Sequence, residues 1–472
     1  MKTKFFFIAL FSLSLLTVSC SNDDDSSNNN TTPEPNIVEL AVANPDLSSL
    51  VAALTRADGN LTTVLSGNGP FTVLAPTNDA FAAFLTANGF ASLEAVPTDV
   101  LSQILLNHVI MADVSSSDLI GMGSGYTSGS ASGPDGLNVS IYFDATSSVT
   151  FNNAGTVSTA DIDASNGTIH IIDGVLALPT IVDHAVANSN FSNLVAALGA
   201  ADGDLVNVLS GDGPFTVLAP DDNAFSTFLN GAALGDVDTA VLSQILLNHV
   251  IIGSTVTSSA LVDAGAGYTN TGASGPGGNA MSLYYNTSSD VVFNGVSTVT
   301  QADVVGTNGI IHAVNTVIDI PTVVTFAAAD PTFSTLVQAL TTLTPATDFV
   351  SILSRTETGN ADMLDPSFTV FAPTNDAFAA LAAIPDEAPL TQILLHHVIK
   401  EANITSSMLN NPGDTTAATI EGDNITITLP GTGDNIADVT DGSGATDIGI
   451  IAVDVQAGNG VIHVINKVMI NN

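Results

Sequence analysis

Gly69-Pro70-Phe71-Thr72-Val73-Leu74-Ala75-Pro76 is the stretch that decides how this chain folds, because it occurs three times. The second copy, Gly213–Pro220, is identical, and the third, Pro366–Pro373, keeps the pattern Phe-Thr-Val-x-Ala-Pro. Self-similarity at a long spacing indicates a repeated structural unit. A chain of 472 residues also suggests three domains, at about 150 residues each. The protein is therefore expected to contain three tandem copies of one unit.

Two further blocks accompany every copy in the same order. The block Gln-Ile-Leu-Leu-Asn-His-Val-Ile lies at 103–110, and related blocks lie at 244–251 and 392–399. The block Asn-Gly-Thr-Ile-His-Ile-Ile lies at 166–172, and related blocks lie at 308–314 and 459–464. This recurrence divides the folded part of the chain into domains at 36–179, 180–321 and 322–472.

Within one copy, the hydrophobic pattern changes from helical to strand-like. Apolar residues between 47 and 54 follow helical spacing, and 71–75 is a short apolar strand. His108 follows Ile104 by four residues, which places it on the apolar face of a second helix. Alternating apolar residues between 137 and 143 indicate a later strand. Helices followed by antiparallel strands predict an α+β domain.

The three blocks together resemble the conserved boxes of the fasciclin (FAS1) domain family, and the resemblance covers residues 36 to 471. It implies a β-wedge of about seven strands flanked by helices, a fold found in extracellular adhesion and matrix-associated proteins. The motif residues are expected to be structural, because a histidine among apolar neighbours usually satisfies backbone groups in a core. They are Phe71, Pro76, His108, Asn166, Gly167 and His170; Phe215, Pro220, His249, Asn308, Gly309 and His312; and Phe368, Pro373, His397, Asn459, Gly460 and His463.

The chain departs from the family pattern at three places. The residue before the first motif histidine is Asn107, Asn248 or His396 rather than the tyrosine linked to integrin binding in animal members, so that recognition is not carried over. The third copy lacks the Gly/Ser-rich insert of 121–136 and 264–278, and it has an extra stretch at 344–365. Each insert is interpreted as a long exposed loop that carries one tyrosine. The candidate adhesive contacts are Asn107, Tyr126, Asn248, Tyr268 and His396.

The N-terminus indicates export and a lipid anchor. Residues 1–19 have the charged and apolar segments of a signal peptide, and Thr17-Val18-Ser19-Cys20 resembles a bacterial lipobox. The resemblance implies cleavage before Cys20, the only cysteine, and its acylation to membrane lipid. Residues 20–35 form a polar, Asp-rich tether. Acidic residues beside the lipidated cysteine also resemble the export signal of surface-exposed outer-membrane lipoproteins; a periplasm-facing position is the alternative.

The charge balance excludes some partners. The chain has 46 acidic and 6 basic residues, a net charge of −40. A basic patch is needed to bind nucleic-acid phosphates, so nucleic acid is not an expected partner. The same charge opposes contact of the domains with anionic membrane surfaces.

Enzymatic motifs are also missing from the sequence. No Gly-x-Ser-x-Gly elbow, His-Glu-x-x-His, Cys-x-x-Cys or phosphate-binding Gly-x-x-x-x-Gly-Lys occurs. Asp161, Asp303 and Asp454 recur near the motif histidines, but a His/His/Asp metal site is a weaker interpretation than a structural role. The pair Asp161-x-Asp163 is not repeated, because Val305 and Gln456 replace its second member. No enzyme activity, cofactor or metal is expected.

Repetition itself suggests the function. Short, proline-containing joints predict a semi-rigid row, and a row of similar domains multiplies weak contacts. We expect a lipid-anchored surface protein that attaches to matrix, polysaccharide or neighbouring cells. The alternative is a ligand-capture lipoprotein for a soluble small molecule or glycan, which predicts a concave pocket in at least one domain.

Overall fold

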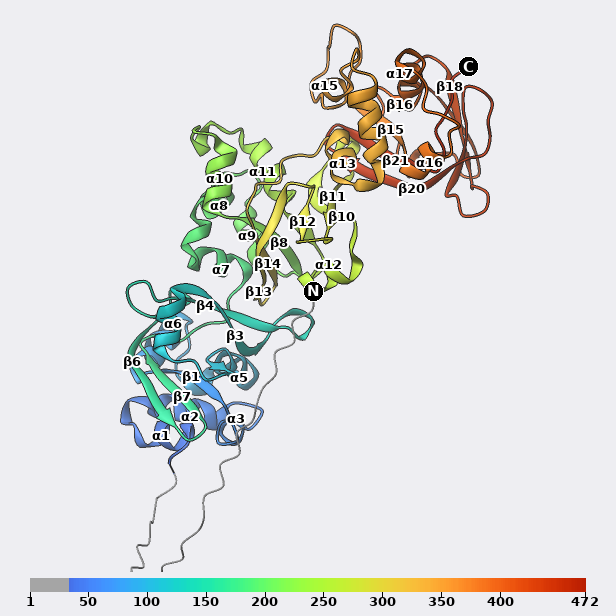
Figure 1. Cartoon of the computed structure of the whole chain (residues 1–472). Helices are drawn as coiled ribbons and strands as arrows, with labels where there is room; N and C mark the ends of the chain where they lie inside the picture. The colour runs from blue at the N-terminus through green and yellow to red at the C-terminus, as the bar shows by residue number, and fades with distance from the viewer. Residues whose placement is uncertain (1–33) are drawn as a thin grey trace, which may run out of the picture.

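The computed structural model describes residues 34–472, which form three successive α+β domains (Figure 1). Domain 1 lies at the blue end, domain 2 follows in green and yellow, and domain 3 ends the row in orange and red. The expected signal peptide (1–19), Cys20 and nearly all of the expected tether (20–35) lie outside the described residues. Within 34–472, no single helix is long and apolar enough to cross a membrane; Ile37–Ala43 and Pro45–Arg56 meet the criterion only as a pair bent by 105°.

Domain 1 has the order expected from its hydrophobic pattern, with helices first and most strands later. Its helices are α1 (Ile37–Ala43), α2 (Ser48–Arg56), α3 (Leu61–Leu65), α4 (Asn78–Ala87), α5 (Thr98–Leu106) and α6 (Ser116–Met122). Its strands are β1 (Phe71–Pro76), β2 (Val109–Ile110), β3 (Ser124–Ser132), β4 (Asn138–Asp144), β5 (Thr150–Phe151), β6 (Gly155–Ala164) and β7 (Gly167–Ile172). They close into a barrel in chain order, with β1 parallel to β7 and antiparallel to β2.

Domains 2 and 3 repeat this plan with seven-stranded sheets. Domain 2 contains α7 (Ile181–Ala187), α8 (Ser192–Ala200), α9 (Leu205–Ser210), β8 (Phe215–Pro220), α10 (Asp222–Leu229), α11 (Thr239–Leu247), β9 (Val250–Ile252), α12 (Ser258–Ala264), β10 (Ala266–Ser274), β11 (Ala280–Asn286), β12 (Val292–Phe293), β13 (Ser297–Gly306) and β14 (Gly309–Val314). Domain 3 contains α13 (Val323–Ala329), α14 (Ser334–Gln338), the π-helix η8 (Ala339–Leu343), α15 (Phe349–Leu353), β15 (Phe368–Pro373), α16 (Asn375–Ala379), α17 (Glu387–His396), β16 (Val398–Ile399), β17 (Gly413–Ala418), β18 (Asn424–Leu429), β19 (Ala437–Thr440), β20 (Ile448–Ala457) and β21 (Gly460–Ile465).

The repeated Phe-Thr-Val-Leu-Ala-Pro strand is buried along its whole length because it separates two cores. All six residues of β1 are buried. Phe71 and Val73 belong to the core shared with the helices, whereas Leu74 belongs to a second core inside the sheet. Side chains of a strand alternate between its two faces, so an apolar run without polar interruption is what a strand between two cores requires.

The Gly/Ser-rich inserts were expected to be exposed loops, and this expectation is wrong. Residues 124–132 and 266–274 are strands β3 and β10, which pair antiparallel with β4 and β11. The tyrosines face one another across these pairs, Tyr126 against Tyr142 and Tyr268 against Tyr284. Cross-strand aromatic pairs and backbone pairing outweigh the low strand propensity of glycine and serine. In domain 3, the strand at this place is the shorter β17.

Each domain contacts the next through the same strands. The Oγ atom of Ser140 on β4 accepts a hydrogen bond from the backbone N–H of Val305 on β13, with an N···O distance of 2.9 Å. At the second joint, Ser282 on β11 accepts from the backbone N–H of Gln456 on β20 at 3.0 Å. The two joints therefore use equivalent residues, so the step from domain 1 to domain 2 is repeated from domain 2 to domain 3 (Figure 1).

An aromatic side chain fills each joint. The ring of Tyr126 stands edge-on to His184 of the following domain, with centroids 5.7 Å apart. Tyr268 stands in the same way against Phe326, also at 5.7 Å, and its hydroxyl donates to Asp330 at 3.0 Å. Burial raises the pKa of both tyrosines far above its usual value.

Candidate functional site

The asparagine of the Asn-Gly motif connects four parts of its domain. The Nδ2 atom of Asn166 donates to the carbonyls of Leu65 and Gly67, both at 2.8 Å, and its Oδ1 accepts from the backbone N–H of Ile37 at 3.0 Å. Its backbone carbonyl accepts from the N–H of Phe71. The same contacts recur at Asn308, with Leu209, Gly211 and Ile181, and at Asn459, with Leu353, Arg355 and Val323. This residue joins the first helix and α3 or its equivalent to the central strands.

The glycine that follows is required by a close approach of two strands. A Cβ atom at Gly167 would lie 1.9 Å from the carbonyl oxygen of Phe71, well inside van der Waals contact. The corresponding distances to the phenylalanine carbonyl are 2.3 Å at Gly309 and 2.2 Å at Gly460. The motif residues Phe71, Phe215, Phe368, Pro76, Pro220 and Pro373 are all buried on the paired strands. The Asn-Gly motif therefore permits the parallel pairing at the centre of each sheet.

The first motif histidine connects a helix to the segment after the last strand. The Nε2 atom of His108 accepts from the N–H of Leu176 at 2.8 Å, so its Nδ1 carries the proton and donates to the carbonyl of Ile104 at 2.7 Å. Burial lowers the pKa of His108, His249 and His397 to about 4, against 6.5 in water. These imidazoles are neutral and fully occupied by backbone groups, so they offer no nitrogen to a ligand.

The second motif histidine lies in a group with the residue types of a catalytic triad. In domain 1 its Nδ1 accepts from the backbone N–H of Asp161 at 3.2 Å, and its Nε2 donates to the carbonyl of Val114 at 2.9 Å. The Asp161 carboxylate instead accepts from the N–H and hydroxyl of Ser116 at the start of α6. No imidazole nitrogen faces the serine oxygen, so the group cannot activate it as a nucleophile. His170, His312 and His463 share this arrangement.

The contact between Asp161 and Ser116 has a structural role instead. Asp161 has φ of 55°, a left-handed conformation at an irregularity in the pairing of β6 with β7. The hydrogen bonds from Ser116 lower the pKa of the Asp161 carboxyl. Asp303 and Asp454 repeat the positive φ and bind Ser258 and Ser406 in the same way. The recurrent aspartate therefore joins a strand irregularity to the start of a helical segment about 45 residues earlier in the chain.

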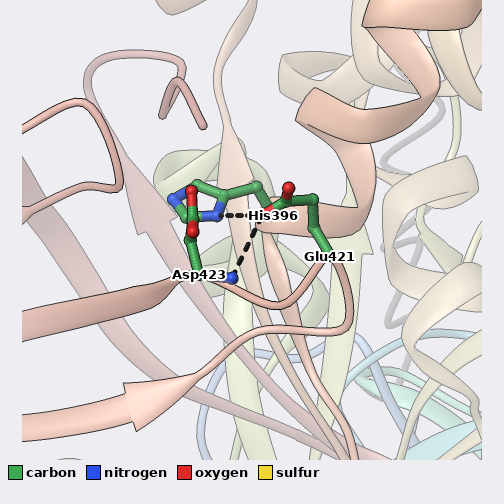
Figure 2. A group of neighbouring side chains, drawn as sticks. All are labelled: His396, Glu421 and Asp423. Atoms are coloured by element: carbon green, nitrogen blue, oxygen red, sulfur yellow. Dashed lines mark hydrogen bonds and ion pairs between the residues drawn. The ribbon is translucent and has the colours of Figure 1, made fainter. Parts of the chain in front are cut away.

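One cluster of possible metal ligands, confined to domain 3, occurs among residues 34–472. His396, Glu421 and Asp423 each offer one ligand atom, and these atoms lie within 4.8 Å of one another (Figure 2). The set is suited to a divalent cation. However, the Nε2 atom of His396 accepts from the N–H of Gly442 at 3.0 Å, so Nδ1 carries the proton. Nδ1 lies 3.3 Å from Thr419 Oγ1 and 3.4 Å from Glu421 Oε2. A cation on Nδ1 would move that proton to Nε2, where Gly442 already donates. The cluster is therefore better described as a hydrogen-bonded brace around the buried His396.

Three of the candidate adhesive contacts lie inside their domains. Asn107, Asn248 and His396 are completely buried. The Nδ2 atom of Asn107 donates to the carbonyl of Ala177 at 3.0 Å, and Asn248 makes the equivalent bond to Asp319 at 3.1 Å. His396 instead accepts from the N–H of Gly442 at 3.0 Å. The adhesive role expected of these three residues is not retained, because their side chains are bonded inside the domains and do not reach the surface.

The two tyrosines also have another position than expected. Tyr126 and Tyr268 lie in the joints between domains, where their rings pack on the following domain. They were expected to be exposed on loops, but their rings are covered by the following domain. Their alternation with glycine and serine along a strand was the signal for this position, since a lone large residue in a strand of small ones needs a packing partner.

The exposed apolar residues at repeated positions were not singled out from the sequence. Met111 follows the short strand β2, and Ile252 is the last residue of β9; they are 62% and 57% exposed. Ile120 and Val262 occupy matching places on α6 and α12 and are 60% and 57% exposed. Aligning the copies shows that these positions stay apolar in domains 1 and 2, which is the signal that could have found them.

Comparison with known proteins agrees with this architecture. The family model described as Fasciclin domain matches residues 45–179, 189–321 and 331–471. Periostin of Homo sapiens is 27% identical over 446 residues, which is 92% of this chain and 47% of periostin. The chain therefore spans about half the length of that relative. The cell surface glycolipoprotein MPB83 of Mycobacterium bovis is 36% identical over 148 residues, 30% of this chain and 60% of MPB83.

A bacterial relative and a solved structure extend the comparison. Protein sll1483 of Synechocystis is 38% identical over 143 residues, 30% of this chain and 73% of that protein. A FAS1 domain pair from the insect cell adhesion molecule Fasciclin I aligns with 58% of this chain and 96% of its own at 19% identity and a TM-score of 0.37. Three family matches, in the order of the three structural domains, cover most of the sequence. The chain therefore belongs to the fasciclin domain family.

Proposed function

We propose that this protein is a lipid-anchored cell-surface adhesin that attaches to matrix, polysaccharide or neighbouring cells through its three fasciclin domains. The observation that carries the proposal is the repeated joint. Ser140 with Val305, and Ser282 with Gln456, place successive domains in equivalent relations. Equivalent surfaces then follow one another along the row, and this is the arrangement in which weak contacts multiply.

The names of relatives support a surface location. MPB83 is a cell surface glycolipoprotein, and Fasciclin I is a cell adhesion molecule. In this chain, acylated Cys20 would hold the row to the outer membrane, and residues 20–35 would separate domain 1 from the lipid. The strong negative charge would keep the domains away from anionic headgroups and favours neutral or cationic partners.

Candidate contact residues follow from exposure. Met111, Ile120, Ile252 and Val262 are apolar and mostly exposed, and they occur in two domains at matching positions. Single exposed apolar side chains are common on proteins, so their contribution would come from repetition along the row. Polysaccharide rings and matrix proteins both offer apolar faces to such side chains.

The proposal is tested by changing the number of domains. Beads that carry the 36–472 fragment, or one domain at equal surface density, are applied to immobilised matrix proteins and glycans. We expect three-domain attachment to exceed single-domain attachment by about 10²-fold or more in avidity. In cells, removal of two domains should reduce surface attachment and biofilm formation.

Two matched variants refine this test. Met111→Ser with Ile252→Ser removes exposed apolar contacts, whereas Thr86→Ser changes an exposed position on α4 that is not repeated. The first should weaken attachment and the second should not. Attachment that is independent of domain number would contradict the adhesin and favour capture of a monomeric ligand.

A further inference from the structure

Domain 3 contains an apolar cavity of about 230 Å³ between its helices and its sheet. The helical walls come from α13, α14, η8 and α15, and the floor comes from Val370 and Ala372 on β15 and Ile462 on β21. The helices contribute mainly aliphatic side chains, among them Leu336 and Leu353. The lining hydroxyl of Thr341 already donates to the carbonyl of Val337 at 2.7 Å. We propose that this cavity is a binding site for a small apolar molecule.

The same place in domain 2 is nearly closed and serves as an internal reference. There the space between α7, α8, α9 and the sheet measures about 20 Å³. Its walls include Ile181, Leu194, Leu198 and Leu209, which correspond in sequence order to Val323, Leu336, Leu340 and Leu353 of domain 3. A fasciclin domain of this chain can thus close the space with nearly the same residues, so the cavity is a feature of domain 3 and not a requirement of the fold.

Three local differences open the cavity. Val323 stands where domain 2 has Ile181, which removes a methylene group. The helix that begins at Ser334 changes to a π-helix at Ala339–Leu343, whereas α8 stays α-helical from Ser192 to Ala200. Phe349 also follows Leu336 by 13 residues, whereas Leu205 follows Leu194 by 11. A π-helical segment widens a helix locally and is frequent at functional sites.

The cavity has access to solvent on the helical side. Ala328, Thr341 and Val350 line it and are exposed, while Val323, Leu336 and Phe349 lie deep and are buried. Thr341 belongs to the π-helix, and Val350 lies in the first turn of α15, the helix that follows the longer connection. Two of the three departures from the domain 2 arrangement, the π-helix and the longer connection, therefore lie at the mouth, where a ligand would enter.

The size and lining define the ligand class. Apolar cavities of about 150 Å³ stay free of water and bind benzene, so this larger space suits one aromatic ring with substituents or a chain of about six to eight carbons. No lining residue is charged, and the one lining hydroxyl has a partner. A sugar or a charged metabolite would therefore lose its hydrogen bonds to water without replacement. This site is independent of the proposed adhesion, which concerns outer surfaces of all three domains.

Methyl NMR of the 36–472 fragment tests the site with toluene and hexan-1-ol as the ring and chain probes. We expect saturable shifts confined to methyl groups such as those of Val323, Leu340 and Ile462, and none at Ile181 or Leu198 in domain 2. Saturation by toluene alone assigns a ring-shaped ligand, and saturation by hexan-1-ol alone assigns a chain. Absence of saturable shifts with both probes, or equal shifts in domains 2 and 3, would overturn the proposal.

Cavity-filling variants locate the binding. Ala327→Leu should abolish the shifts and raise the melting temperature of domain 3, because the side chain occupies the space. The matched change Ala185→Leu in domain 2, where there is no space, should lower the melting temperature of domain 2 and leave probe binding unchanged. A second filling variant covers the case in which Ala327→Leu does not fold. This variant, Val323→Ile with Ala328→Val, restores the domain 2 residues at both positions and should weaken probe affinity at least threefold. Unchanged probe binding in the folded filling variants would also overturn the proposal.

Discussion

His108 Nε2 lies 2.8 Å from the backbone nitrogen of Leu176, and this bond couples α5 to a segment 68 residues later in the chain. His249 is related to Ile318 at 2.8 Å and His397 to Met469 at 3.0 Å in the same way. Each bond holds the segment after the last strand of its domain against the turn that directly follows α5, α11 or α17 and carries the histidine. A domain therefore cannot release its last segment without leaving a buried imidazole and a buried N–H group unpaired.

Replacing this histidine should destabilise its own domain. His108→Leu leaves the N–H of Leu176 buried without a partner, which typically costs about 1–3 kcal/mol. Amide hydrogen exchange measured at low urea concentrations should be faster in β1 and β7 of the variant than in the wild type. Exchange in β8 and β14 of domain 2 should be unchanged. Val100→Ala, at an exposed position of the same helix, is the control and should have little effect. Equal exchange rates in the His108→Leu variant and the wild type would contradict this role.

The same histidines should make stability fall in mild acid. Burial holds the pKa of His108, His249 and His397 at about 4, whereas the unfolded value is 6.5. Between these values the unfolded chain binds protons that the folded domains do not, so lower pH favours unfolding. Each domain should lose about 2–3 kcal/mol between pH 7 and pH 4.5. Carboxyls whose pKa is lowered by folding, such as that of Asp161, reduce the free energy of unfolding only when the pH falls below their ordinary pKa of 3.8.

Denaturant curves at pH 7, 5.5 and 4.5 provide the measurement. In the His108→Leu variant, the pH dependence of domain 1 should become shallower, while domains 2 and 3 keep theirs. Stability that is flat from pH 7 to pH 4.5 would mean that these imidazoles are accessible to protons in the folded state.

The sequence was sufficient to predict the repeated unit, because its motifs report local and short-range requirements. Asn166 and Gly167 form a turn in which only glycine fits at the second position, and the Asn-Gly pair shows this requirement in every copy. The joints were not predicted, because they depend on which face of one domain meets the next. Asp163 illustrates this: it is exposed on the free face of domain 1, whereas its equivalents Val305 and Gln456 are buried in joints. Replacement of the carboxylate by valine or glutamine therefore accompanies burial of this position in a joint.

The position before the first motif histidine was also misjudged. Asn107, Asn248 and His396 were named as candidate adhesive contacts, yet each is completely buried, and the two asparagines bond to the segment after the last strand of their domains. A polar residue on the apolar side of a helix was equally consistent with a buried hydrogen bond. Only the return of the chain after the last strand, which no local pattern reports, decides between the two positions.

A hydroxyl supports this asparagine in one domain only. Thr271 Oγ1 donates to Asn248 Oδ1 at 3.2 Å, whereas Asn107 Oδ1 is buried without a partner beside Gly129. Thr271→Val keeps the shape and removes the donor, so domain 2 should lose about 1–3 kcal/mol. Thr269→Val, two residues earlier on the same strand, is the control. Thermal unfolding of both variants measures the difference, and equal melting temperatures would show that the bond contributes nothing.

The brace in domain 3 should not behave as a metal site. His396 Nε2 accepts from Gly442, and the protonated Nδ1 lies 3.3 Å from the hydroxyl oxygen of Thr419 and 3.4 Å from Glu421 Oε2. We therefore expect zinc at micromolar concentration, or chelation by EDTA, to leave the melting temperature of domain 3 unchanged. A rise of several degrees with zinc that is lost in His396→Asn would contradict this assignment, since asparagine is the residue of domains 1 and 2 at this position.

It should be possible to loosen a joint without destabilising the domains that it connects. In the first joint, Ser140 accepts from the N–H of Val305, and the hydroxyl of Tyr126 accepts from Asn188 at 3.2 Å. The double change Ser140→Ala and Tyr126→Ala removes both contacts and the packing on His184, so domains 1 and 2 should take a wider range of angles. Small-angle X-ray scattering of the 36–472 fragment should then show a broader distribution of interdomain distances, with the melting transitions of domains 2 and 3 nearly unchanged. Ser130→Ala is the matched control, because Ser130 binds the carbonyl of Val109 within domain 1 and should affect that domain without altering the scattering. If the double variant scatters like the wild type, the row is held by the remaining strand contacts, and multivalent attachment cannot depend on these two residues.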